Sequence, residues 1–154
     1  MTYLLDTDIV SAVAPTKSDR PAALARWLDD ASSGLYLSAA TAAEIQAGIA
    51  KAARLGAARK ASLLRDWWDS VEHLYGARIL PFDLRTAAVA GKIIDIARSA
   101  GHEPGFADVV IAATAQTHAL TILTRNIRHF EPLGGPVLNP IDQLPPPLSA
   151  GKRR

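Results

Sequence analysis

Short apolar runs alternate along this chain with longer stretches of helical periodicity. The patterns typical of buried strands cover residues 3–5, 35–37, 78–82 and 121–123, with a fifth candidate at 137–138. The helical patterns begin at Asp8, cover residues 22–30, 41–55 and 57–75, run from a cap at Asp83 to Ala100, and cover 106–119. Because strands alternate with helices, the sequence predicts a single-domain α/β fold with a mainly parallel central sheet flanked by helices.

The helix predicted over residues 57–75 carries a wide apolar stripe. Its members fall within an arc of about 140° at helical spacing, and they are Leu63, Leu64, Trp67, Trp68, Val71, Leu74 and Tyr75. We expect at least one tryptophan to face the core, while the other can serve a partner, since tryptophan is enriched in interface hot spots. Residues 51–65 contain five basic residues and no acid. This stretch fits either a solvated helix face or a surface that binds phosphate or a partner.

Composition sets the outer limits. The 154 residues suit one domain, which we place at residues 1–141, followed by a Pro-rich basic tail, expected to be mobile, at 142–154. The net charge is +2, of which Lys152, Arg153 and Arg154 supply +3, leaving −1 for the rest of the chain. The basic pI is therefore weak support for nucleic-acid binding.

The chain contains no cysteine, which excludes disulfides, cysteine-bound zinc and thiol nucleophiles. No apolar run approaches the roughly 20 residues that cross a bilayer, and the N-terminal residues do not have the pattern of a secretory signal. We therefore expect a cytoplasmic protein that does not enter the membrane.

Two aspartates stand where chemistry is expected in a parallel sheet. Asp6 directly follows the first predicted strand, and active sites of such sheets gather outside the carboxyl ends of the strands. Taken alone, it fits a turn or helix cap equally well. Asp108 is the single charge in the run Phe106 to Ala113. A lone buried carboxylate costs several kcal/mol unless it is paired or binds a metal, and the alternative role for Asp108 is a favourable charge at a helix N-terminus.

Glu44 is a third candidate with a specific alternative. Thr41 to Glu44 fits the capping box, in which the glutamate bonds back to the threonine amide. Its helix also follows a strand, so Glu44 can instead lie at the same sheet edge as Asp6 and Asp108. Three carboxylates there fit a hard cation such as Mg²⁺, which could activate water against a phosphodiester.

The remaining polar candidates follow the fourth predicted strand. Asn126 can add an amide oxygen to the metal site or form a turn, and Arg125 can bind a phosphate or simply face solvent. The four histidines lack paired zinc spacing, and the chain has neither a Gly-x-Ser-x-Gly elbow nor a glycine-rich phosphate loop.

At these residues the chain resembles the PIN-domain family, especially the VapC and FitB toxins of bacterial toxin–antitoxin pairs. The resemblance covers about residues 1–141. It rests on Leu4 to Ser11, Leu37-Ser38 with Thr41 to Glu44, Ile79 to Asp83, Ala107-Asp108 with Ile111 to Ala115, and Leu123 to Asn126.

The resemblance implies a Mg²⁺- or Mn²⁺-dependent endoribonuclease in which Asp6, Glu44 and Asp108 are the acidic site residues. Asn126 stands where some members carry a fourth aspartate, and Asp8 stands where asparagine is more usual. The resemblance further implies a homodimer with a cognate antitoxin, which in turn binds DNA.

Two other functions fit part of the pattern. A haloacid-dehalogenase-like phosphatase would use Asp6 as nucleophile and Asp8 as acid–base, but it also needs a later pair of acids, and only Asp108 is present there. A catalytically silent PIN fold would serve as a binding module. Retention of all three acids favours the nuclease.

Overall fold

The computed structural model describes residues 1–148, and the basic cluster predicted to lie in a mobile tail falls outside the described residues. The strands are β1 (Tyr3–Leu5), β2 (Leu35–Ser38), β3 (Ile79–Leu80), β4 (Thr121–Leu123) and β5 (Val137–Leu138). The α-helices are α1 (Thr7–Ala12), α2 (Ala22–Asp30), α3 (Ala39–Arg54), α4 (Ala58–Tyr75), α5 (Leu84–Ser99), α6 (Phe106–Thr117) and α7 (Ile127–Phe130). Short 3₁₀ turns cover Ser32–Gly34, Gly76–Arg78 and Glu131–Leu133. No helix within these residues has the length and apolar content needed to span a bilayer.

The five strands form one sheet in the order β3-β2-β1-β4-β5, and every pairing is parallel. The predicted α/β fold with a parallel central sheet is therefore confirmed. β1 lies in the centre, with Leu5 level with Leu37 of β2 and Leu123 of β4. The carboxyl ends of these three strands consequently meet at one edge, where the strand order reverses and ligands of such sheets bind.

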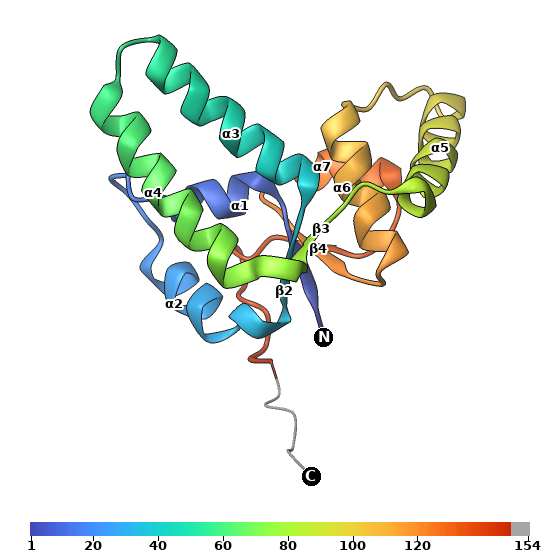
Figure 1. The fold of residues 1–154 in the computed structure, drawn as a ribbon. Helices are drawn as coiled ribbons and strands as arrows, with labels where there is room; N and C mark the ends of the chain where they lie inside the picture. Colours follow the sequence, from blue (N-terminus) through green and yellow to red (C-terminus); the bar gives the residue numbers. More distant parts are fainter. Residues whose placement is uncertain (149–154) are drawn as a thin grey trace.

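Alternating side chains of the sheet pack into two separate hydrophobic cores, one on each face. Tyr3 and Leu5 of β1 pack with α1, α2, α3 and α4, whereas Leu4 packs with α5, α6 and Phe130 on the opposite face. Figure 1 shows these two helical layers on either side of the strands. A strand buried on both faces reads as a continuous apolar run, which explains why Tyr3-Leu4-Leu5 contains no polar residue.

Helix α3 begins earlier than the pattern predicted. Its N-cap is Ser38, whose hydroxyl accepts a hydrogen bond from the Ala40 amide at 3.1 Å. Thr41 is therefore a buried residue of the first turn, and the capping box proposed for Thr41 and Glu44 is wrong. By contrast, the cap predicted at Asp83 is present, since its carboxylate accepts from the Thr86 amide.

The apolar stripe of α4 is only partly covered. Trp68 and Tyr75 lie in the core, and Leu64, Trp67 and Val71 are partly buried against it. Leu74 remains about half exposed. One tryptophan, Trp68, thus lies in the domain's own core, as expected, while Trp67 is only partly buried against it.

The chain continues along the domain after β5. Pro145 is buried, and Leu148 packs against the core beside Gly34. This segment therefore contributes apolar contacts at the end of the domain away from the strand carboxyl ends, near the end of α2.

Candidate active site

Asp6 is the buried centre of the polar cluster at the carboxyl edge of the sheet. It is the N-cap of α1, and its Oδ1 accepts from the Thr7 amide at 2.8 Å. The hydroxyl of Thr124, directly after β4, donates to Oδ2 at 2.8 Å. The side chain is only 6% exposed. The register of β1 with β4 therefore places Asp6 against Thr124, 118 residues later in the chain.

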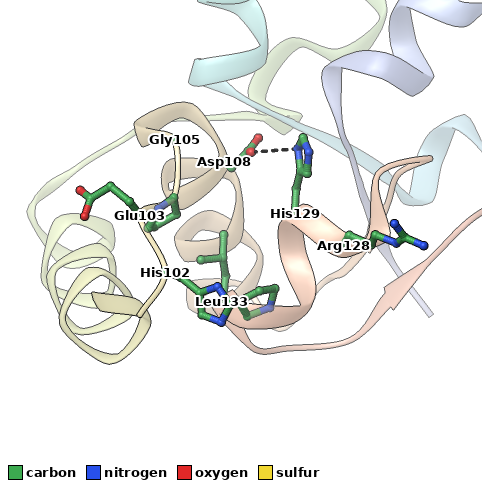
Figure 2. Close-up of a pocket in the computed structure, with 9 residues that line it drawn as sticks. His102, Glu103, Gly105, Asp108, Arg128, His129 and Leu133 are labelled. Atoms are coloured by element: carbon green, nitrogen blue, oxygen red, sulfur yellow. Dashed lines mark ion pairs between the residues drawn. The ribbon is translucent and has the colours of Figure 1, made fainter. Parts of the chain in front are cut away.

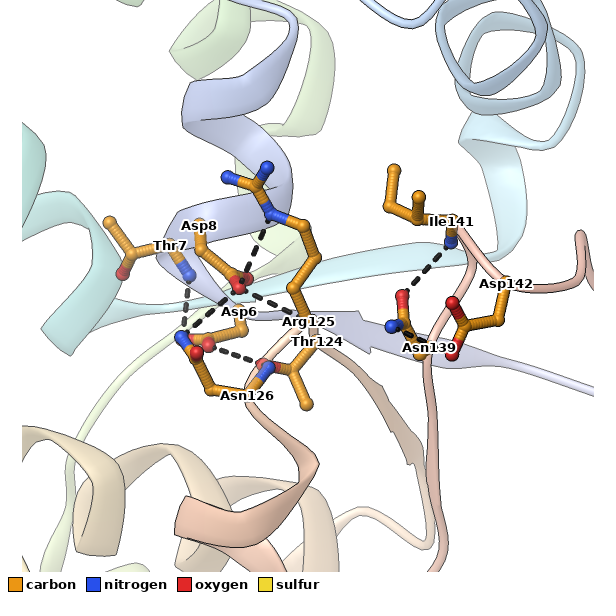
Figure 3. Close-up of polar contacts among 9 residues, drawn as sticks. All are labelled: Asp6, Thr7, Asp8, Thr124, Arg125, Asn126, Asn139, Ile141 and Asp142. Carbon is orange, nitrogen blue, oxygen red and sulfur yellow. Dashed lines mark hydrogen bonds and ion pairs between the residues drawn. The ribbon is translucent and has the colours of Figure 1, made fainter.

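Asp8, in the first turn of α1, ties this helix to the segment after β4. Its Oδ2 accepts from the Arg125 amide at 2.9 Å and from the Asn126 side-chain nitrogen at 3.2 Å, and the Arg125 Nε lies 3.8 Å away. Figure 3 shows these groups gathered beside Asp6. The other oxygen, Oδ1, is buried without a hydrogen-bond partner among the described residues. A buried carboxylate oxygen in this condition invites a cation or water.

Glu44 reaches the cluster from α3. Its carboxylate accepts from the Thr7 hydroxyl at 2.7 Å, and the Thr7 hydroxyl also lies 3.1 Å from that of Thr41. Glu44 itself is exposed to solvent. Its side chain therefore points toward the edge occupied by Asp6 rather than back to its own helix terminus.

Asp108 approaches from α6, in the first turn of the helix. Its Oδ2 lies 3.5 Å from Nδ1 of His129. A dashed line in Figure 2 marks this pair. The side chain is 30% exposed, so Asp108 borders the solvent rather than lying fully inside the apolar helix. The favourable helix N-terminus and a catalytic position are compatible, because both place the carboxylate at the same end of α6.

Burial and mutual repulsion disfavour the charged forms of Asp6 and Asp108 in this cluster. Burial, reinforced by the charge of Asp8, raises the pKa of Asp6 to about 7, although the bonds from Thr124 and Thr7 lower it in part. Burial also raises the pKa of Asp108, which His129 partly offsets, while Glu44 and Asp8 raise it further. The negative charges thus act on one another from α1, α3 and α6, and a bound cation would relieve this repulsion.

These residues have the oxygen ligands that a divalent cation prefers, although each carboxylate also contacts another residue of the chain. Within residues 1–148, no three acidic or histidine side chains are grouped closely enough to coordinate one ion. The oxygen donors, the unpartnered Asp8 Oδ1 and the raised pKa of Asp6 nevertheless match a hard-cation site. Asn126 enters the cluster through its amide nitrogen, so its metal-binding role stays a prediction.

Comparison with known proteins places this geometry in a family. The PIN domain family matches residues 3–134. This chain belongs to the PIN-domain family.

The PIN-domain assignment extends to curated relatives across most of the chain. Toxin FitB of Neisseria gonorrhoeae is 38% identical over 139 residues, covering 89% of this chain and 96% of the toxin. VapC ribonuclease Y4jK of Sinorhizobium fredii is 32% identical over the same shares of the two chains. The predicted resemblance to FitB and VapC proteins is therefore confirmed.

Solved structures agree with the PIN fold. The structure of FitAcB from Neisseria gonorrhoeae has a TM-score of 0.77 and 36% identity, covering 91% of this chain and 99% of that one. Other solved structures with this fold are toxin–antitoxin complexes, some of them bound to DNA.

Sequence reasoning on this PIN domain missed the neutral groups that hold the acids. Thr7 and Thr124 were not singled out, Thr41 was considered only as a helix cap and His129 only as a zinc ligand, because a hydroxyl or imidazole at these positions has no distinctive sequence pattern. The position of Thr124 after β4, at the same sheet edge as Asp6, was the one available signal.

Proposed function

We propose that this PIN-domain nuclease is the toxin of a toxin–antitoxin pair and hydrolyses RNA phosphodiester bonds with Mg²⁺ or Mn²⁺. The observation that carries the proposal is the convergence of Asp6, Asp8, Glu44 and Asp108 on one sheet edge, with a strongly raised pKa at Asp6. The names of the relatives, a toxin and a ribonuclease, support the substrate and the biological role. The phosphatase alternative loses its basis, because the matched family is the PIN domain.

Asp6, Glu44 and Asp108 would hold the cation, with the Asn126 side chain as a fourth candidate. When bound, the cation would lower the pKa of a water molecule and neutralise charge developing on the phosphate. The protein's own groups would position the substrate and the acids. Thr124 and the Thr7 amide fix the orientation of Asp6, and the Thr7 hydroxyl fixes Glu44, whose exposed carboxylate can accept a proton from an attacking water.

Arg125 is the residue best placed to bind the phosphate. Its guanidinium is about half exposed and approaches Asp8 at 3.8 Å, which holds it at the rim of the acidic cluster. A positive group there can contact an RNA phosphate while the acids bind the cation. Because the pair is solvated and loosely spaced, Arg125 can turn from Asp8 to the substrate at little cost.

The decisive experiment is a metal titration followed by RNA cleavage. Purified protein, stripped with EDTA, is given Mg²⁺ or Mn²⁺ and a mixed RNA substrate. We expect cleavage only with added metal, and its loss in Asp6→Asn and Asp108→Asn. Asp30→Asn, on the exposed end of α2, is the matched control and should cut like the wild type. Full activity of either site variant would refute the proposed site, and metal binding without cleavage would favour a silent PIN module.

The partner would be a small antitoxin that docks beside α4. A hollow between α1, α3 and α4 runs from Glu44 past Ile45 and Ile49 to Leu64 and Trp67. It joins an acidic end at the site to an apolar wall, which suits an apolar segment carrying a basic side chain toward Asp6. Complexes among the solved structures support an antitoxin partner, and DNA would be reached only through the antitoxin.

Expression in cells tests the biological role separately. The wild type should arrest growth when expressed alone and be rescued by the neighbouring small gene, whose product should co-purify with it. Asp6→Asn should relieve the arrest but keep the complex. A harmless wild type with RNA-cleaving activity in vitro would retain the nuclease and remove the toxin role. Sedimentation of the purified protein tests the expected homodimer.

A further inference from the structure

A second hollow lies beside Asp108, and apart from Asp108 and its neighbour His129 its lining residues have no part in the chemistry described so far. It has a volume of about 320 Å³ and lies between the loop 102–105 and the segment 128–133 (Figure 2). Asp108 lines its inner end, so whatever occupies the hollow lies next to the proposed cleavage site. This volume is at the lower end of the range, about 300–1,000 Å³, in which proteins bind small ligands.

The walls combine flat apolar surface with polar groups at the rim. Pro104, Pro132 and Leu133 supply the apolar part. His102 adds an imidazole ring from the loop, and Arg128 and His129 add donors from α7. Aromatic or apolar side chains with a few hydrogen-bonding groups are the surroundings that unpaired bases of single-stranded RNA find in proteins.

The charges that line the hollow favour a base over a phosphate as its occupant. Two acidic residues, Glu103 and Asp108, line it together with Arg128. A phosphate inside would face both of them, whereas a base can donate N–H groups to a carboxylate. The hollow therefore suits the uncharged base, while Arg128 at the rim can contact the adjoining phosphate.

Glu103 lies at the outer edge of the hollow, where its exposed side chain is paired with an arginine. Arg98 of α5 donates from Nε at 3.2 Å and from Nη2 at 3.0 Å, and both bonds end on Oε1. No described residue bonds the other oxygen, Oε2. The arginine thus holds the carboxylate by one oxygen and leaves the second available to accept an N–H group from a ligand.

We propose that this hollow, at the loop 102–105 and residues 128–133, is a base-recognition subsite for the nucleotide next to the scissile phosphate. The inference rests on the proposed ribonuclease function and deepens it, because it assigns the choice of cleavage position to His102 and Glu103. A base that presents an amino group fits Glu103 best, whereas the apolar walls fit any base.

The test compares cleavage profiles on a random RNA pool, read by sequencing the cut ends. The wild type should show an enriched amino-bearing base at one position beside the cut. Glu103→Gln and His102→Ala should reduce this enrichment about tenfold, the loss expected for one hydrogen bond to a charged group. For the favoured RNA, KM should rise while kcat changes little. Glu72→Gln and His73→Ala on α4 are matched exposed controls that should keep the wild-type profile.

A binding measurement without metal keeps the inference separate from catalysis. Short fluorescent RNAs that differ in one base are titrated into EDTA-treated wild type and the same four variants. Weaker and less selective binding by Glu103→Gln and His102→Ala alone supports the subsite. Unchanged base selectivity in both, or equal binding of base-free ribose 5-phosphate, overturns it. A protein that binds with base selectivity but cuts no RNA would instead overturn the proposed nuclease function.

Discussion

Replacing Asp6 with asparagine should stabilise the protein at alkaline pH while removing its activity. The pKa of Asp6 is raised from 3.8 to about 7 in the fold, chiefly by burial and then by Asp8. Between these values the folded protein keeps a proton that the unfolded chain has lost, so stability falls as the pH rises. At about 1.4 kcal/mol for each pKa unit, the full penalty above pH 7 is about 4 kcal/mol.

Asparagine abolishes this penalty and keeps the shape. Its carbonyl oxygen can still accept from the Thr7 amide, and the Thr124 hydroxyl can turn to accept from the new side-chain N–H. Allowing for imperfect bonds, we expect Asp6→Asn to exceed the wild type by about 1–4 kcal/mol at pH 8 and to match it near pH 4.

Urea unfolding in EDTA between pH 4 and 8.5 measures this difference directly. Subtracting one protein's curve from the other removes the titration of all other groups. Added Mg²⁺ should narrow the gap at pH 8, since a cation bound by the wild type offsets the same repulsion. A variant that is less stable than the wild type at pH 8, or a gap that does not depend on pH, would show that Asp6 carries no electrostatic stress.

Three further substitutions follow from the same contacts. Glu44→Gln should lower RNA cleavage by orders of magnitude at unchanged unfolding midpoint, because Glu44 is exposed and caps no helix; near-normal cleavage rates would remove it from the site. Thr124→Val should cost about 1–3 kcal/mol at pH 8 and less at pH 5, since it leaves a charged Asp6 oxygen without its donor; equal losses at both pH values in urea unfolding would contradict this. Leu148→Ala should cost about 1 kcal/mol in thermal or urea unfolding by uncovering the core near Gly34, and no loss would mean that the segment is not packed there in solution.

The strands and their order along the chain were predictable because a strand that is buried on both faces must be apolar at successive positions. Leu4 packs on one side of the sheet and Leu5 on the other, so neither position tolerates a polar residue. Asp6 was singled out because it follows the first strand and Asp108 because it is the single charge in an apolar run, and their catalytic roles stay predictions. The pairing of strands is not a local property, and the parallel sheet came from the alternation of elements rather than from any single segment.

Short sequence motifs were misleading where the same residue types at the same spacing fit two different structural roles. Thr41 and Glu44 satisfy the capping-box spacing, yet Ser38 is the cap, because the helix continues straight from β2. His129 gave no signal, since its contact with Asp108 depends on how α7 returns to α6. Contacts of this kind are decided by tertiary packing, which short-range periodicity does not record.

The dependence of Asp6 on Thr124 has a consequence for the protein while it is being made. The central strand β1 leaves the ribosome first, but one of its two neighbours, β4, is among the last elements synthesised. Contacts between such distant segments form late, since the intervening chain must be ordered first. A growing or truncated chain that ends before residue 124 lacks the hydroxyl that holds Asp6, along with Arg125 and Asn126. We therefore expect incomplete chains to lack the RNA-cleaving site, which forms only after the whole domain has been synthesised.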